Sequence, residues 1–433
     1  MSVTHDFIHF FRDSSPYIHS HRGKCFVIAL GGDAIKSADF ASIIHDMALL
    51  SSLGVKLILV HGSRPQIDEQ LALYGKTCRY EGNRRITTPD ILPCVLLACG
   101  ALRLQIEALF SMGLPNSPMH GASVNVVSGN WVTAKPLGVV HGIDFEHTGC
   151  IRKLDVEAIS QVINGGSIAL LSPVGFSLTG EIFNLSYEEV AREVAVSLRA
   201  DKLIYFSLER GITDLNQQLV RELSPEKMNE VALSTENRLL VEHAFSSCEA
   251  GVQSCHLVSY QESGSLLAEL YTREGAGTLI SLTPYEGIRG ATFVDVGGML
   301  ELIAPLERSG VLVKRSRERL EQEIDHFCVI ERGGMIIGSA ALYPFEAEKM
   351  AELACLVVHE EYRDQDRGKK LLGFIELRAK ELGLSKLFVL TTHTAHWFIE
   401  NGFVRGDIDA LPCEKKRLYN YQRGSQIFWK KLA

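Results

Sequence analysis

The chain has 433 residues, 46% of them hydrophobic and 22% charged, which is ordinary for a soluble globular protein, and its length favours two domains over one. A formal net charge of -8 argues against a general nucleic-acid binder, because such proteins usually carry a basic excess. No apolar run approaches the ~18 residues of a membrane-spanning helix, and the ten cysteines include no C-x-x-C pair, which indicates reduced core cysteines in a cytoplasmic protein and argues against a zinc site.

Residues 1–284 alternate between strand-like and helix-like segments. Apolar and β-branched runs predict strands at 25–30, 55–62, 166–175, 201–207, 255–260 and 277–282. Helical apolar spacing predicts helices at 39–54, 89–113 and 187–200. Because such alternation is typical of a sheet covered by helices on both faces, we expect a three-layer α/β/α domain with a mostly parallel sheet.

A connector containing proline and glycine, at 283–290, marks the change to a second domain, residues 285–433. In that domain we expect helices at 294–310, 316–325 and 368–383, strands at 351–359 and 385–392, and a β-hairpin at 327–345 that turns at Gly333 and Gly334. We expect this second domain to belong to the α+β class.

A charged turn, EEYRDQDRGKKLL at 360–372, joins the strand expected at 351–359 to the next helix. A helix that follows a strand and a tight turn presents unpaired backbone N–H groups and partial positive charge, which suit a pyrophosphate. Gly368 would let the backbone approach a phosphate. Arg363, Arg367 and Lys369 would add charge-assisted hydrogen bonds.

This turn resembles the acetyl-CoA motif of the GNAT acetyltransferases, in which a strand ending L-x-V precedes Q/R-x-x-G-x-G/A. The strand end matches LVV at 356–358, and the loop from Arg363 to Gly368 matches the first and last motif positions, with Asp366 in place of the middle glycine. AHWFIENGF, at 395–403, resembles the family's A-x-x-F-Y-x-x-x-G-F segment. The resemblance implies an acetyl-CoA site made of Leu356, Val357, Val358, Arg363, Gln365, Arg367, Gly368 and Lys369.

The first half resembles the amino-acid kinase family, most closely N-acetylglutamate kinase. The matching segments are VIALGGDAI, ILVHGSRPQID, NRRITT, TGEIFNLS and GSLLAELYTREGAGTLI. A kinase-like half joined to a GNAT half is the arrangement of the bacterial N-acetylglutamate synthases. That resemblance implies acetyl transfer from acetyl-CoA to the α-amino group of L-glutamate, the first step of arginine biosynthesis, with feedback inhibition by L-arginine, no metal, and a homo-oligomer, a hexamer in the family.

The kinase-like half is expected to lack kinase activity. Phosphoryl transfer needs cations and backbone donors around the γ-phosphate. Ala29 occupies the position of a family lysine, and Gly62-Ser63-Arg64 replaces the three glycines of the second loop. A retained fold without its chemistry indicates a regulatory and oligomerisation role.

The arginine-inhibited members bind arginine between an N-terminal helix and the end of the kinase-like domain. The matching positions here are Tyr17, Lys202, His256, Glu269 and Gly275. A guanidinium pairs with a carboxylate such as that of Glu269 in forked geometry. Lys202 or the Tyr17 hydroxyl would meet the ligand's carboxylate.

Acetyl transfer to an α-amine needs a base, because an amine with a pKa of roughly 8 or above is mostly protonated at neutral pH. Glu352 is the candidate, and strand alternation would place it on one face with Ala354 and Leu356. Backbone N–H groups at 356–358 would polarise the thioester carbonyl.

Two further roles follow from the resemblance. Phe398 stands where GNAT enzymes usually carry a tyrosine as general acid, so Thr391 or solvent would protonate the CoA thiolate. A substrate with two carboxylates needs a basic pocket, and the candidates are Lys314, Arg315, Arg317 and Arg423, of which Arg315 and Arg423 match by family position.

Two alternatives stay open. The departures at Asp366 and Phe398 also fit a non-catalytic sensor of an amino acid and acetyl-CoA. The kinase-like half leaves N-acetylglutamate kinase as a third function.

Overall fold

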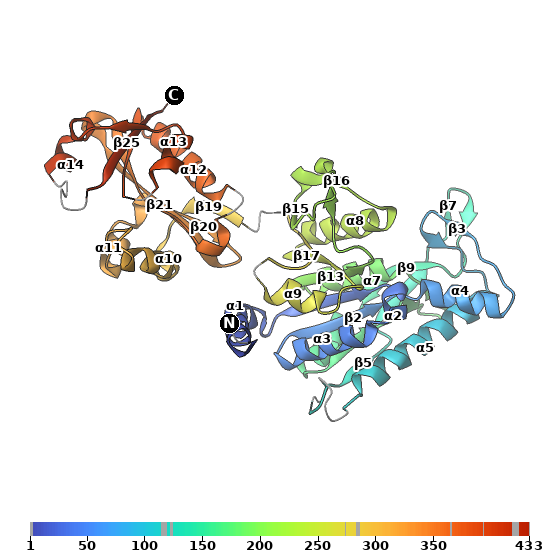
Figure 1. Ribbon diagram of the computed structural model, residues 1–433. Helices are drawn as coiled ribbons and strands as arrows, with labels where there is room; N and C mark the ends of the chain where they lie inside the picture. Colours follow the sequence, from blue (N-terminus) through green and yellow to red (C-terminus); the bar gives the residue numbers. More distant parts are fainter. Residues whose placement is uncertain are drawn as a thin grey trace. The chain divides into compact units, whose positions relative to one another are not determined.

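The computed structural model describes residues 3–113, 119–121, 124–272, 274–282, 286–363, 366–392, 394–417 and 424–432. The chain divides into two compact units, Met1–Thr283 and Pro284–Ala433. The division lies one residue from the boundary expected after residue 284. Figure 1 shows the first unit in blue to yellow and the second in yellow to red.

An eight-stranded sheet forms the centre of the first unit, in the order β15-β18-β17-β13-β1-β2-β10-β5. Its strands are β1 (Cys25–Leu30), β2 (Lys56–His61), β5 (Val126–Ser128), β10 (Ile168–Leu171), β13 (Lys202–Ser207), β15 (Glu222–Leu223), β17 (Ser254–Ser259) and β18 (Thr278–Ile280). Neighbouring strands are parallel except β17 and β18, which are antiparallel. The prediction of a mostly parallel sheet is confirmed.

Helices cover both faces of this sheet (Figure 1). They are α1 (Val3–His21), α2 (Gly32–Lys36), α3 (Phe40–Ser52), α4 (Arg64–Leu73), α5 (Leu92–Phe110), α6 (Val156–Asn164), α7 (Tyr187–Ser197), α8 (Thr235–Glu249), α9 (Ser265–Tyr271) and the 3-10 helix η1 (Pro225–Glu230). Phe26 and Ile28 of β1 join a core with α3, α5 and α9, whereas Val27 and Ala29 join a second core with α6, α7 and α8. Successive strand residues face opposite sides, so the sheet separates two cores as the three-layer prediction requires.

The run at 166–175, expected as one strand, contains two. β10 lies in the large sheet, whereas β11 (Val174–Phe176) belongs to a four-stranded sheet of order β12-β11-β6-β9. Pro173 separates the two strands, because proline has no N–H for the ladder. The other small strands are β6 (Val132–Pro136), β9 (Gly149–Leu154), β12 (Ile182–Asn184), and the pairs β3 (Tyr80–Glu81) with β4 (Arg84–Arg85), β7 (Val139–Val140) with β8 (Ile143–Asp144), and β14 (Thr213–Asp214) with β16 (Val231–Ala232).

Within the described part of the chain, α5 is one helix that is long and apolar enough to cross a membrane by length and composition. Its Cys94, Val95 and Ala98 pack in a cluster with Ile67 of α4. Its last turns, including Ile106, join the core beneath α3.

A seven-stranded sheet forms the second unit, in the order β19-β20-β21-β22-β23-β25-β24. Its strands are β19 (Glu286–Gly290), β20 (Phe327–Arg332), β21 (Met335–Phe345), β22 (Met350–Val358), β23 (Lys386–Thr391), β24 (Val404–Gly406) and β25 (Gln426–Lys431). β22 and β23 are parallel and the other neighbours antiparallel. β20 and β21 form the expected hairpin around Gly333 and Gly334.

The second unit also has helices on both faces of its sheet. They are α10 (Val296–Arg308), α11 (Arg317–Gln322), α12 (Arg367–Glu381), α13 (Ala395–Glu400), α14 (Cys413–Arg417) and the 3-10 turns η2 (Phe293–Asp295), η3 (Ile324–His326), η4 (Glu346–Glu348), η5 (Glu360–Tyr362) and η6 (Ile408–Ala410). Leu371 and Ile375 of α12 pack on one face with Ile330. Met299 of α10 and Leu320 of α11 pack on the other. The α+β prediction is confirmed.

Candidate functional site

A groove of about 960 Å³ lies beside β22 and β23 in the second unit. These strands pair over three residues of β22, from Met350 to Glu352. Beyond Glu352, both the following residues of β22 (353–358) and the end of β23 (389–391) line the groove. The groove therefore opens where the pairing between the two strands ends.

A β-bulge interrupts β22 inside the groove. Ala354 pairs with Ala341, but Val357 pairs with Ser339, so β22 carries one extra residue at this point. Cys355 takes the left-handed conformation there, with φ of 52°. The extra residue resets the alternation: Leu356 packs with the core beneath α12, whereas Ala354 packs with the core beneath α10. The expectation that Ala354 and Leu356 share a face is therefore wrong.

Glu352 is held in the groove as the candidate base. It pairs with Tyr343 of β21 on one side and Phe388 of β23 on the other, and 8% of its surface is exposed. Its Oε2 atom lies 2.6 Å from Nζ of Lys415, on α14. Among the described residues Glu352 forms an ion pair with Lys415, and a carboxylate with this burial and this partner is fixed in position at the lining of the groove.

Thr391, the candidate general acid that would protonate the CoA thiolate, lies at the end of β23. The Thr391 hydroxyl is 2.9 Å from the Thr394 hydroxyl, and both residues line the groove. Phe398 is buried and also lines it, and its side chain has no proton to donate.

The charged turn leads into α12 as expected. Asp366 is the N-cap residue and has φ of 56°, a left-handed conformation that glycine adopts freely and that aspartate tolerates better than most residues. Its carboxylate lies 2.9 Å from the Lys369 ammonium. The aspartate at the motif's glycine position therefore takes a backbone conformation that glycine adopts freely, and its charge is paired.

The residues expected to bind acetyl-CoA divide into three groups. Arg363, Gly368 and Lys369 line the groove together with residues 356–358. Arg367 is 3% exposed, and its guanidinium donates to both carboxylate oxygens of Glu286 at 2.7–2.9 Å. The positive charge of Arg367 is therefore neutralised by an ion pair inside the protein. Gln365 lies outside the described residues.

The basic residues expected to bind the substrate also divide. Arg315 lines the groove, and among the described residues its buried Nε atom has no hydrogen-bond partner. Arg317 pairs with Glu321 on the exposed side of α11 and does not line the groove, whereas Arg319, two positions on, does. Arg423 lies outside the described residues.

Sequence reasoning missed Lys415. It belongs to the run CEKKR, which resembles ordinary surface charge, and nothing in that run marks one lysine over another. Arg319 could have been distinguished from Arg317 by the capping serine, Ser316, because its bond to the N–H of Arg319 fixes where α11 begins.

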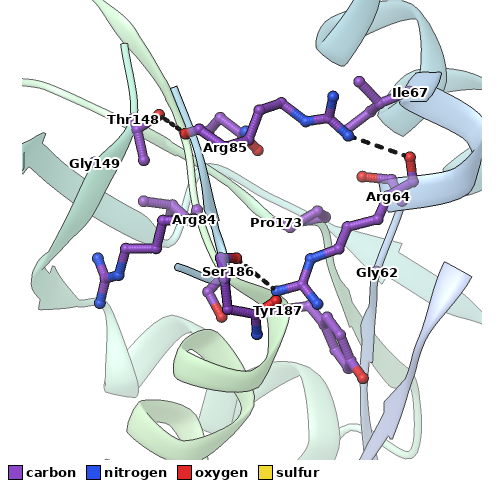
Figure 2. Close-up of a pocket in the computed structure, with 14 residues that line it drawn as sticks. Gly62, Arg64, Ile67, Arg84, Arg85, Thr148, Gly149, Pro173, Ser186 and Tyr187 are labelled. Atoms are coloured by element: carbon purple, nitrogen blue, oxygen red, sulfur yellow. Dashed lines mark hydrogen bonds between the residues drawn. The ribbon is translucent and has the colours of Figure 1, made fainter. Parts of the chain in front are cut away.

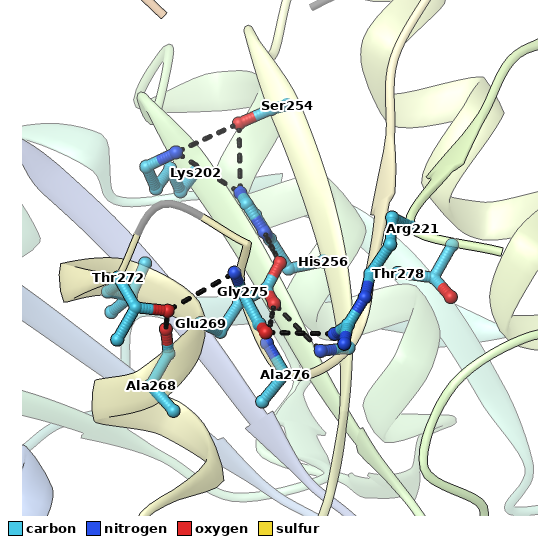
Figure 3. Close-up of polar contacts among 12 residues, drawn as sticks. Lys202, Arg221, Ser254, His256, Ala268, Glu269, Thr272, Gly275, Ala276 and Thr278 are labelled. Atoms are coloured by element: carbon cyan, nitrogen blue, oxygen red, sulfur yellow. Dashed lines mark hydrogen bonds and ion pairs between the residues drawn. The ribbon is translucent and has the colours of Figure 1, made fainter. Parts of the chain in front are cut away.

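A second polar cluster lies in the first unit and contains four of the five residues expected to bind arginine (Figure 3). His256 Nδ1 lies 2.7 Å from Glu269 Oε1, and its Nε2 lies 3.1 Å from the Lys202 ammonium. Glu269 Oε2 accepts bonds of 2.8 Å from the N–H groups of Ala276 and Gly277. A Cβ added to Gly275, which has φ of 69°, would lie 2.5 Å from that oxygen, so the turn needs glycine.

The fifth residue, Tyr17, lies on α1. Ser14 and His21 of this helix contact the carbonyl oxygens of Tyr271 and Leu270, at 3.1 and 2.9 Å, at the end of α9. Tyr17 is three and four positions from these residues and so shares their helix face. α9 also carries Glu269, so the structure places Tyr17 on the side of α1 that contacts this element.

Burial sets the charges in this cluster. It lowers the pKa of Lys202 to about 8. Burial and the Lys202 charge lower the pKa of His256. Burial alone would raise the pKa of Glu269, but hydrogen bonds from His256 and from two backbone N–H groups outweigh it, and the pKa is lowered. A neutral His256 therefore donates to an ionised Glu269.

The Glu269 carboxylate already accepts three hydrogen bonds among the described residues. A carboxylate offers about four acceptor positions. The bidentate hydrogen bonding with a guanidinium that is expected from the sequence would therefore require His256 or one of the two backbone N–H groups to move away from Glu269.

A small pocket of about 40 Å³ lies at the Gly62-Ser63-Arg64 loop of the first unit (Figure 2). Arg64 points into it and pairs with Glu188 at 3.1 Å. Tyr187 lines it, and a Cβ at Gly62 would lie 2.9 Å from the Tyr187 ring. The side chains of Arg64 and Tyr187 therefore narrow the space at this loop, and the loss of kinase chemistry stays a prediction.

The chain matches two family models, the amino acid kinase family over residues 24–259 and the acetyltransferase (GNAT) domain over residues 323–405. It is 51% identical to the amino-acid acetyltransferase of Pseudomonas putida over 99% of this chain and 100% of that protein, and 50% identical to that of Azotobacter vinelandii over the same shares. The crystal structure of N-acetylglutamate synthase from Neisseria gonorrhoeae complexed with coenzyme A and L-arginine superposes with a TM-score of 0.91 at 36% identity, covering 98% of this chain and 99% of that one. Its complex with coenzyme A and N-acetyl-glutamate superposes with a TM-score of 0.63. The chain therefore belongs to the amino-acid acetyltransferases, the bacterial N-acetylglutamate synthases that join a kinase-like domain to a GNAT domain.

Proposed function

We propose that the protein transfers the acetyl group of acetyl-CoA to the α-amino group of L-glutamate, giving N-acetyl-L-glutamate and CoA as the first step of arginine biosynthesis. The observation that carries the proposal is Glu352, a nearly buried carboxylate fixed between two strands inside a groove large enough for both substrates. The ligands named for the Neisseria gonorrhoeae complexes support this substrate pair.

The donor would be held by the first turn of α12. Lys370 is the first residue of this turn to donate within the helix, to the Asp366 carbonyl at 3.0 Å, so the N–H groups of residues 367–369 point toward the loop. These groups, with the cations of Arg363 and Lys369, suit a pyrophosphate. The pantetheine arm would lie along β22 beyond Glu352.

The reaction needs a neutral amine. Glu352 would take a proton from the glutamate ammonium, and the amine would then attack the thioester carbonyl carbon. Backbone N–H groups at 356–358 would stabilise the negative charge that develops on the carbonyl oxygen. The C–S bond breaks, the nitrogen gives up its second proton to solvent, and the leaving thiolate is protonated by solvent or by Thr391, which recovers its proton from solvent. Arg315 would bind one of the two substrate carboxylates.

L-arginine would act as a feedback inhibitor at the cluster of Tyr17, Lys202, His256, Glu269 and Gly275. The half-buried Lys202 ammonium suits the α-carboxylate of arginine, and the ionised Glu269 carboxylate suits its guanidinium. The first unit would then serve regulation and assembly rather than phosphoryl transfer. We also propose a cytoplasmic homo-oligomer, a hexamer by family resemblance.

The decisive experiment is an acetyl-transfer assay with acetyl-CoA and L-glutamate, with and without L-arginine, read as N-acetylglutamate formed. We expect turnover on glutamate, suppression by arginine, and no ATP consumption when N-acetylglutamate and ATP are supplied. Turnover that arginine leaves unchanged would remove the inhibitory site.

The non-catalytic sensor is the second candidate, because Phe398 has no proton to donate. Calorimetric binding of acetyl-CoA without any turnover of glutamate would favour the sensor over the enzyme.

A further inference from the structure

The nearest charged partner of Glu352 is a lysine that no motif predicted. Nζ of Lys415 lies 2.6 Å from Glu352 Oε2, the lysine side chain is 26% exposed and the glutamate side chain 10%. Both residues line the groove. The pair is thus closed off on the glutamate side and reachable from the groove on the lysine side.

The surroundings of α14 hold Lys415 in this position. The N–H of Cys413 donates to Glu348 at 3.1 Å, and Lys416 pairs with Asp409 at 3.4 Å, away from the groove lining. Of the two adjacent lysines, Lys415 is the one that lines the groove. The short helix α14 therefore directs the Lys415 ammonium, and not that of Lys416, toward the Glu352 carboxylate.

Stability alone is a weak reason for such a pair. Taking two charges out of water costs several kcal/mol per ion, and a largely buried ion pair often adds nothing to the free energy of unfolding. A pair that a ligand completes is different, because each charge then meets two opposite charges. Glu352 and Lys415 side by side offer one negative and one positive group at a single point of the groove.

An α-amino acid carries the matching arrangement. Its ammonium and carboxylate are attached to the same carbon and lie as close together as two hydrogen-bonded atoms. Docked head to tail, the ammonium meets Glu352 and the α-carboxylate meets Lys415. Resting on the proposed function, we propose that Lys415 binds the α-carboxylate of the acceptor amino acid and so presents the adjacent amine to Glu352. Arg315 is then left for the side-chain carboxylate.

This assignment is tested with the two monoamides of glutamate. Isoglutamine lacks the α-carboxylate charge, and glutamine lacks the side-chain charge. We expect Lys415→Met to raise the KM for glutamate by about 10- to 100-fold, the usual effect of losing a charge-assisted hydrogen bond. The preference for glutamate over isoglutamine, as a ratio of kcat/KM values, should fall by a similar factor, whereas the preference over glutamine stays as in the wild type.

Lys416→Met is the matched control, since it removes a neighbouring lysine that pairs outside the groove, and it should leave all these ratios unchanged. Lys415→Arg should restore much of the selectivity because it keeps the charge. A Lys415→Met protein that binds acetyl-CoA normally but discriminates against isoglutamine as the wild type does would overturn the assignment. If Lys415→Met does not fold, Lys415→Gln takes its place and must meet the same criteria.

Failure of this inference differs from failure of the proposed function. If the wild type does not acetylate glutamate at all, the proposed function is wrong. If it does, and the Lys415→Met variant (or Lys415→Gln in its place) keeps the wild-type kcat/KM ratios, then only the role assigned to Lys415 is wrong.

Discussion

Replacing Glu352 with glutamine tests the proposed chemistry most directly. The variant keeps the size of the side chain and an oxygen for Lys415, which lies 2.6 Å away, but it cannot take a proton. A general base contributes about 10²- to 10⁴-fold to the rate. At about 1.36 kcal/mol per factor of ten, its loss raises the activation free energy by about 3–5 kcal/mol. We expect kcat to fall by at least about 100-fold.

The cost in stability should be much smaller. The Lys415 side chain is 26% exposed, so its ammonium recovers part of its hydration. Exchanging a charge-assisted hydrogen bond for a neutral one costs about 1–2 kcal/mol, which corresponds to a lowering of Tm by about 2–8 °C for a unit of this size. At 25 °C the variant should therefore be folded, and its rate reports on the chemistry.

The assay measures N-acetylglutamate by mass spectrometry, acetyl-CoA affinity by calorimetry and Tm by circular dichroism. Glu346→Gln, an exposed position on η4, is the matched control. The first turn of α12 follows β22, whose end lies roughly 20 Å along the strand from Glu352, so acetyl-CoA affinity should hardly change. A glutamine variant that keeps most of its kcat, or that loses kcat and acetyl-CoA affinity by the same factor, would refute the role of Glu352 as base.

Four further outcomes are expected. Arg315→Ala should raise the KM for glutamate by about 10- to 100-fold, and an unchanged KM would remove this residue from the pocket. Glu269→Ala should abolish inhibition by arginine while leaving uninhibited activity, and full inhibition in that variant would contradict the assignment. Gly275→Ala, which places a Cβ 2.5 Å from Glu269 and adds about 1–2 kcal/mol of left-handed backbone strain, should weaken inhibition in a dose–response curve; an unshifted curve would count against the cluster. The pKa of Lys202 is about 8 in the fold against an ordinary 10.5, so between these pH values the unfolded chain binds more protons than the folded one. The free energy of unfolding should therefore rise with pH through that window, by about 1–2 kcal/mol after allowing for the partial exposure of Lys202. Urea unfolding at several pH values should show this rise in the wild type and not in Lys202→Met, and parallel curves for the two proteins would contradict it.

The sequence predicted the layers of both units because burial leaves a periodic trace. In β1 alternate residues enter two cores, and in α12 apolar positions recur at helical spacing. The split of 166–175 was missed although Pro173 was visible, because the apolar run continues on both sides of it.

The bulge in β22 could not be predicted from that strand. It exists as a mismatch with β21, where Ala354 and Val357 take partners out of step, and one strand's pattern does not contain its neighbour's register.

The site residues show the same division. The motif placed Gly368 and Lys369 correctly at the start of α12, because the spacing from strand to helix is local. Arg367 belongs to the same motif, but its charge is paired with Glu286, 81 positions earlier in the chain. Lys415 likewise meets Glu352 across a long stretch of sequence. Long-range partners of this kind are set by topology, which the sequence of one segment does not record.

Beyond the paired residues of β22 and β23, the main chain of residues 353–358 borders the groove on the side of β23 instead of a neighbouring strand. The backbone N–H and C=O groups along such an edge can form hydrogen bonds with a bound ligand that contains amide groups. Selection of the acyl donor would then depend on the carrier: a thioester of a simple alkyl thiol brings the same acetyl group but none of the amides, and it should leave that edge to water.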